Sequence, residues 1–137
     1  MDLFNCLERK LGKLPIIVED LGFLTDSVLK LVRDTKYPGM KVLQFAFDSR
    51  EESDYLPHNY DKNCVVYTGT HDNDTITTWF TKCISQKERE YIRKYMNFKG
   101  NKEVAWEYIR CGMASVADTA IFPIQDYLCL GREAKIN

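Results

Sequence analysis

Four short apolar runs along the chain each end in polar residues. The runs cover residues 16–18, 41–47, 64–67 and 119–124, the last of them interrupted by Pro123. Runs of this length that contain valine, isoleucine and aromatic residues are typical of buried strands. We therefore predict four strands, each of which delivers polar side chains to its carboxyl end.

Helical patterns occupy most of the intervals between these runs, and residues 49–62 form a polar loop. In each pattern the apolar residues recur on one helical face, and Gly or Pro follows several of the patterns. Ser85 and Glu88 have the spacing of a capping box. The predicted helices are residues 2–11, 25–37, 75–80, 85–99 and 102–116.

Strands that alternate with helices predict a parallel sheet with right-handed crossovers. In such sheets the reactive groups collect at the carboxyl ends of the strands, both in open sheets and in (β/α) barrels. An open sheet usually has a glycine-rich phosphate loop after its first strand, and the sequence contains no such motif. We therefore predict an α/β fold in which residues 1–137 form a single domain, part of a (β/α)₈ TIM barrel.

Two of the predicted strand ends carry most of the candidate chemistry. Glu19 and Asp20 follow the first run, and His71 and Asp72 follow the third. Carboxylates are costly to bury unless they are paired or neutralised, so these clusters indicate a catalytic rim rather than a packed core.

The acids near the other strand ends receive structural interpretations. Asp48 and Asp126 are interpreted as strand-end and turn residues, and Asp74 as the cap of the helix that begins near it.

Composition and charge narrow the function classes. The net charge is −1, with 19 basic and 20 acidic residues, which gives no electrostatic case for nucleic acid or an anionic membrane as partner. No apolar run has the length of a membrane span and the N-terminus has no signal pattern, so we expect a soluble, cytoplasmic protein. The five cysteines stand far apart and only two histidines are present, so we expect reduced thiols and neither a metal nor a cofactor.

The segments that contain the four runs closely resemble the 4-α-glucanotransferases of glycoside hydrolase family 77, the amylomaltases or disproportionating enzymes. The resemblance extends over essentially the whole chain in collinear order. Its four blocks are IIVEDLG (16–22), PGMKVLQFAF (38–47), VVYTGTHDNDT (65–75) and AIFPIQDYLCLGREAKIN (120–137). This resemblance implies a (β/α)₈ barrel that moves α-1,4-glucan segments between maltooligosaccharides by a retaining double displacement, without a cofactor.

The resemblance also implies roles for individual residues. Glu19 matches the family's acid/base, Asp72 matches its transition-state stabiliser, and His71 matches a histidine that contacts the sugar beside the scissile bond. Asp20 is expected to line the acceptor side. These roles fit the chemistry, because a glycosidic oxygen is a poor leaving group that needs a proton donor, while a carboxylate on the opposite face traps the sugar.

The family block that holds the nucleophilic aspartate has no counterpart in this sequence. The match runs from about the fourth helix to the eighth strand of the barrel. We therefore expect a segment of a 4-α-glucanotransferase that is inactive alone and pairs with the missing N-terminal half of the barrel or with another copy. Two alternatives stay open, namely a non-catalytic glucan-binding or assembly module and an amylase-class hydrolase.

Overall fold

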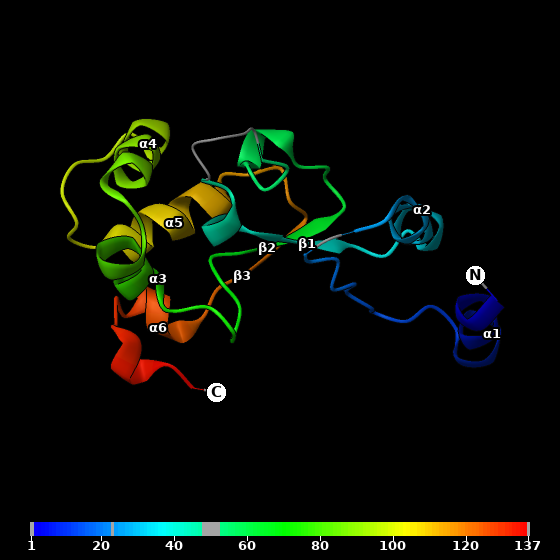
Figure 1. Cartoon of the computed structure of the whole chain (residues 1–137). Helices are drawn as coiled ribbons and strands as arrows, with labels where there is room; N and C mark the ends of the chain where they lie inside the picture. The colour runs from blue at the N-terminus through cyan, green and yellow to red at the C-terminus, as the bar shows by residue number, and fades with distance from the viewer. Residues whose placement is uncertain (1, 23, 48–52, 137) are drawn as a thin grey trace.

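A three-stranded parallel sheet lies at the centre of the molecule (Figure 1). The computed structural model describes residues 2–22, 24–47 and 53–136. The strands are β1 (Gly39–Val42), β2 (Cys64–Tyr67) and β3 (Thr119–Ile121), in the order β1-β2-β3. In register, Gly39 of β1 lies opposite Cys64, and Val65 of β2 lies opposite Thr119. The predicted parallel sheet is confirmed, and its carboxyl ends share one edge.

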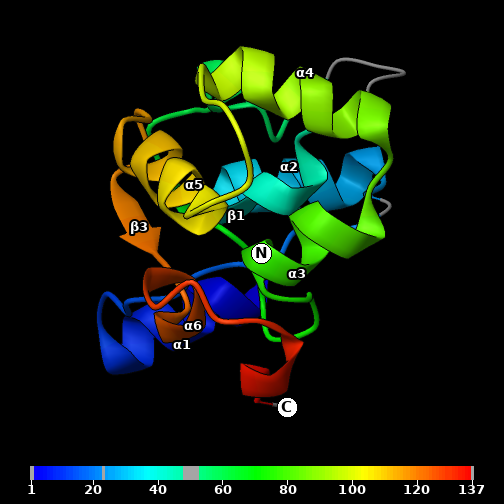
Figure 2. The same ribbon diagram turned by 90° about the vertical axis from the view of Figure 1, so that its left-hand side faces the viewer.

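The helices lie in two groups on either side of this sheet. Those between β2 and β3, together with the one after β3, gather on one side, whereas the first two lie on the other (Figures 1 and 2). The helices are α1 (Asp2–Leu11), α2 (Asp26–Thr35), α3 (Ile76–Thr78), α4 (Gln86–Met96), α5 (Val104–Met113) and α6 (Ile124–Tyr127), with a π-helical turn at Trp79–Cys83. In the ranges that the structure describes, no helix is both long enough and apolar enough to cross a membrane.

The capping box predicted at the start of α4 is confirmed. The Glu88 N–H donates to Ser85 Oγ at 3.2 Å, and the Ser85 N–H donates to the Glu88 carboxylate at 2.7 Å. The helix ends at Met96, and its C-cap Asn97 has a left-handed φ of 56°, a conformation that asparagine tolerates better than most residues. The end of α4 therefore precedes the predicted break at Gly100.

The strand predicted over residues 41–47 is wrong in its second half. The strand ends at Val42, and residues Leu43–Phe45 form a 3-10 turn. In this turn the Gln44 N–H donates to the Thr68 carbonyl at 3.2 Å. The turn also lets Leu43 enter the core with no exposed area. Tertiary contacts therefore override the strand propensity of this run.

The run at residues 16–18 does not form a full strand. Its single ladder contact is a parallel bridge between Val18 and Gly39, in which the Val18 N–H donates to the Pro38 carbonyl at 2.9 Å. Ile17 is 42% exposed, so the run lacks the burial on both faces that a central parallel strand has. The bridge still fixes the residues after Val18 beside β1. Asp48, predicted to end the next strand, lies outside the described residues.

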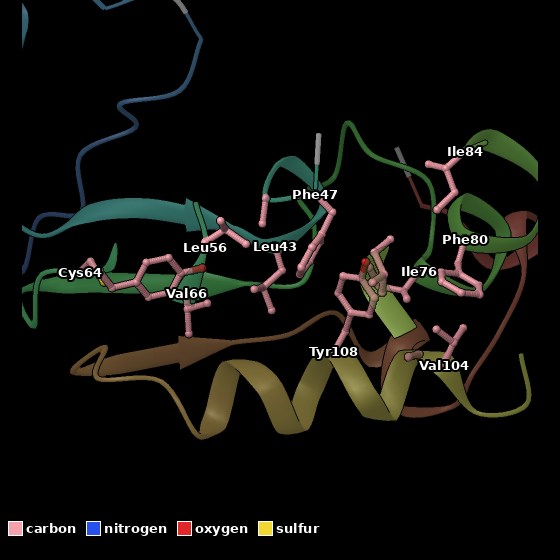
Figure 3. Packing of buried hydrophobic residues seen from close by; sticks show 14 residues of the cluster. Leu43, Phe47, Leu56, Cys64, Val66, Ile76, Phe80, Ile84, Val104 and Tyr108 are labelled. Atoms are coloured by element: carbon pink, nitrogen blue, oxygen red, sulfur yellow. The ribbon is translucent and has the colours of Figure 1, made fainter. Parts of the chain in front are cut away.

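The hydrophobic core lies between the carboxyl half of the sheet and helices α3, α4 and α5 (Figure 3). Helix α5 contributes a buried stripe with helical spacing, which confirms the helix expected over 102–116 with shorter limits. Tyr108 of this stripe packs edge-on against Phe47 and Trp79, with ring centroids 5.8 and 5.9 Å apart. Ile76 and Phe80, which come directly after the loop that follows β2, belong to this core. The core therefore fixes the end of that loop.

Apolar surface is exposed on both sides of the sheet. No residue of α1 or α2 is buried, and all three residues of β3 are exposed. Leu3 on α1 is 66% exposed, and Ile124 on α6 is 62% exposed. Leu3 and Ile124 therefore belong to the apolar side chains that this fold leaves exposed to solvent.

Candidate functional site

A cleft of about 530 Å³ opens beside the carboxyl ends of β1 and β2. Glu19 lines it after the Val18 bridge, and His71 and Asp72 line it from the loop after β2. The rings of Phe45 and Tyr55 form an apolar part of the wall and meet edge-on, with centroids 5.5 Å apart. The structure therefore brings together three of the four residues singled out in the sequence.

Asp20, the fourth, is directed at β1. Its Oδ1 accepts a hydrogen bond from the Met40 N–H at 2.7 Å. A Cβ atom on Gly39 would lie 2.3 Å from Asp20 Oδ2, so a side chain at position 39 would displace the Asp20 carboxylate. Asp20 is half-buried and does not line the cleft, whereas Glu19 beside it is exposed there. The carboxylate of Asp20 thus fixes the backbone from which Glu19 projects.

The loop that carries His71 and Asp72 is closed by Asn73. The Thr70 N–H and hydroxyl both donate to Asn73 Oδ1, at 2.8 and 2.9 Å, and the Asn73 N–H donates to the Thr70 carbonyl at 3.1 Å. This turn leaves His71 and Asp72 exposed at its tip. His71 Nε2 lies 3.4 Å from Asp72 Oδ1. The two side chains can therefore present an imidazole and a carboxylate to the same ligand.

Asp126 ties the two ends of this loop together from beneath. It is 1% exposed, and its carboxylate accepts hydrogen bonds from the Thr68 hydroxyl at 2.6 Å and the Ile76 N–H at 2.9 Å. Burial raises the pKa of Asp126, and these two hydrogen bonds oppose the rise. The interpretation of Asp126 as a turn residue missed this role. Its position after the fourth apolar run was the one sequence signal that placed it near the loop.

Asp74 does not cap α3, contrary to the sequence-based interpretation. The cap is Thr75, whose hydroxyl accepts from the Thr78 N–H at 3.4 Å. The Asp74 carboxylate instead accepts two hydrogen bonds from Arg132, Nε to Oδ1 at 2.9 Å and Nη2 to Oδ2 at 2.6 Å. The hydrogen bond from Arg132 is the largest cause that lowers the pKa of Asp74. Arg132 was not among the residues that sequence reasoning identified.

Replacing Asp126 by alanine is expected to lower the free energy of unfolding by about 3 kcal/mol, because the Thr68 hydroxyl and the Ile76 N–H would lose their buried acceptor. Asp126→Asn is the matched control. Its amide oxygen can still accept from Ile76 while its amide group donates to Thr68, so a smaller loss is expected. Urea denaturation followed by circular dichroism measures both. Equal stability of the alanine variant and the unsubstituted protein would contradict this structural role.

The cleft suits a hydroxyl-rich ligand. Its carboxylates accept hydrogen bonds from hydroxyl groups, its imidazole can donate or accept, and its aromatic rings offer apolar faces. Within the described ranges, no group of three His, Cys, Asp or Glu side chains could hold a metal ion.

Comparisons with known proteins give a consistent result. A family model described as 4-alpha-glucanotransferase of glycoside hydrolase family 77 matches residues 1–137. The chain is 48% identical over 137 residues to a 4-alpha-glucanotransferase of Clostridium butyricum, covering 100% of this chain and 28% of that protein. It is 43% identical over 142 residues to a 4-alpha-glucanotransferase of Thermus thermophilus, covering 98% of this chain and 28% of that protein.

A solved structure resembles the whole fold. It is an amylomaltase from Streptococcus agalactiae in complex with acarbose, with a TM-score of 0.92 and 36% sequence identity. The match covers 99% of this chain and 28% of that chain. The chain therefore spans 28% of the length of each of these three proteins.

Proposed function

Because the chain belongs to the 4-alpha-glucanotransferases of glycoside hydrolase family 77, we propose that it forms part of the active site of an enzyme that transfers α-1,4-glucan segments between maltooligosaccharides. The observation that carries this proposal is the shared cleft. Glu19 lies far from His71 and Asp72 in the sequence, yet all three line one cavity beside the carboxyl ends of parallel strands. Active sites of (β/α) barrels lie at this end of the strands.

The proposed architecture is a segment of a (β/α)₈ barrel, from about its fourth helix to its eighth strand. Two observations support it. Strands β1, β2 and β3 are parallel neighbours in one sheet, and the chain superimposes on an amylomaltase with a TM-score of 0.92. The exposed apolar surfaces of α1, α2 and β3 are the places where the rest of the barrel, or a second copy of the chain, would dock.

Glu19 acts as the general acid in this mechanism. It donates its proton to the glycosidic oxygen as the bond to the sugar breaks, and the leaving saccharide carries that proton away. A carboxylate on the opposite face of the sugar forms a glycosyl ester, and we assign this nucleophile to a part of the barrel outside residues 1–137. Glu19 then removes a proton from an acceptor hydroxyl, which opens the ester and forms the new glycosidic bond. Transfer occurs because a sugar hydroxyl, rather than water, reaches the ester.

Asp72 and His71 act on the sugar ring. The Asp72 carboxylate accepts hydrogen bonds from ring hydroxyls, which strengthen as the ring distorts toward the transition state. His71 lies beside it and contacts the sugar next to the scissile bond. The assignment of Asp20 to the acceptor side stays a prediction. In this structure Asp20 Oδ1 accepts a hydrogen bond from the Met40 N–H.

A chimeric enzyme tests the proposed function. Residues 1–137 replace the matched segment of the Clostridium butyricum relative, which is 48% identical to them, and the chimera is incubated with maltotriose. Chromatography is expected to show glucose together with maltooligosaccharides longer than maltotriose, whereas the 137-residue chain alone is expected to show no product. Glucose and maltose without longer products would instead indicate a hydrolase. Binding of acarbose without any product would indicate a glucan-binding module.

A further inference from the structure

Side chains of the segment after β3 form hydrogen bonds with the loop that carries His71 and Asp72. Below the loop, Asp126 accepts hydrogen bonds from both of its ends. At the tip, Lys135 Nζ donates to the Asp72 carbonyl at 3.1 Å. Between these points Arg132 binds Asp74. Asp126, Arg132 and Lys135 therefore contact the loop at its two ends, at Asp74 and at its tip.

Arg132 makes the most directional of these contacts. Its planar guanidinium donates to both oxygens of Asp74, and such a two-point contact fixes orientation as well as distance. The side chain of Asp74 is only 11% exposed, and its backbone carbonyl accepts from Gln44 Nε2 at 2.7 Å. Asp74 is therefore held from two sides, by a buried glutamine and by an arginine on another segment.

The contact between Arg132 and Asp74 is expected to hold the loop in place and to add little to the free energy of unfolding. The side chain of Arg132 is 71% exposed, and ion pairs with an exposed partner contribute little to global stability. Asp72, however, lies at the exposed tip of the loop, two residues before Asp74. The orientation of the Asp72 carboxylate depends on the backbone that Arg132 holds through Asp74.

We propose that Arg132 is a positioning residue for transfer, which holds the loop so that Asp72 and His71 meet the distorted sugar in the correct orientation. This inference rests on the proposed function, in which Asp72 acts mainly in the transition state. Without the hydrogen bonds from Arg132 to Asp74, the loop would sample positions in which Asp72 and His71 are wrongly oriented. Substrate binding in the ground state would change little, because the loop supplies only part of the cleft wall.

Kinetics of the chimera test this inference. Arg132→Ala is expected to lower kcat roughly tenfold to hundredfold, as small displacements of catalytic groups do, with KM unchanged. Arg132→Lys keeps the charge but loses the two-point contact, so it is expected to recover part of the rate. Arg110→Ala is the matched control, because it removes another arginine–carboxylate contact, with Glu107 on α5. Its kcat is expected to equal that of the unsubstituted chimera.

Two further readouts separate positioning from stability. Amide hydrogen exchange over residues 70–74 is expected to be faster in Arg132→Ala than in the unsubstituted chimera, while the urea midpoint stays the same. Unchanged exchange together with unchanged kcat would overturn the inference. A lower urea midpoint that accompanies the loss of kcat would also overturn it, since Arg132 would then act on folding.

Failure of the proposed function gives a different pattern. An unsubstituted chimera without products would disprove transfer, and the exchange experiment alone would then decide whether Arg132 holds the loop. Products from the chimera, abolished by substitution of Glu19 but unaffected by Arg132→Ala, would leave the function standing and remove the positioning role.

Discussion

Glu19→Gln in the chimera is expected to lower the rate of transfer from maltotriose by about three orders of magnitude, with glucan binding largely intact. The amide has nearly the shape of the carboxyl group but cannot donate a proton to the glycosidic oxygen, and general acid catalysis contributes effects of this size. Glu19 is exposed in the cleft, so the substitution leaves no buried group without a partner. Product formation by chromatography and acarbose binding by calorimetry measure the two parts of this expectation.

A donor with a better leaving group gives a sharper form of the test. Maltosyl fluoride needs little protonation as its bond to carbon breaks, so the first step of the Glu19→Gln variant is expected to recover with this donor. Glu8→Gln is a control that makes the same chemical change on α1, an exposed helix outside the cleft. Unchanged turnover of maltotriose by Glu19→Gln would remove this residue from the mechanism.

Asp72→Asn is expected to lower kcat on the order of a thousandfold while KM changes little. In the proposed mechanism the aspartate accepts hydrogen bonds from ring hydroxyls that strengthen in the distorted transition state, and its negative charge faces the developing positive charge of the sugar. The asparagine keeps the shape of the side chain but lacks that charge. Steady-state kinetics of the chimera over a range of maltotriose concentrations separate the two constants.

The control for Asp72→Asn is Asp118→Asn. Asp118 is an exposed aspartate whose carboxylate lies 3.5 Å from Lys62 Nζ, and it does not line the cleft. Its substitution is expected to leave both constants unchanged. A rise in KM at constant kcat in the Asp72→Asn variant would make Asp72 a binding residue instead of a transition-state stabiliser.

The sequence predicts where three polar residues gather better than it predicts the strands. Glu19, His71 and Asp72 were expected at strand ends, and the parallel arrangement brings them to one cleft because such ends share an edge of the sheet. That reasoning needs only the order of apolar runs. It does not need the runs to be regular strands along their whole length, and the run at 41–47 leaves the strand after Val42.

The residues that hold the loop could not be found in this way. Asp126 and Arg132 each lie 58 residues from a partner, Thr68 and Asp74 respectively. Single-sequence patterns report local periodicity and capping, so they correctly identified the capping box at Ser85. A contact between side chains so far apart depends on the packing of the whole chain. The order of apolar runs places Asp126 near the loop, but no local signal in the sequence identifies either contact.

In the proposed assembly, another part of the barrel or a second copy of the chain covers the exposed apolar surfaces of α1, α2 and β3. Whatever covers them binds the folded form and not the unfolded one, so it shifts the folding equilibrium by mass action. The midpoint of unfolding then rises with the concentration of the covering segment. In that assembly the free energy of unfolding belongs to the complex and not to the chain alone.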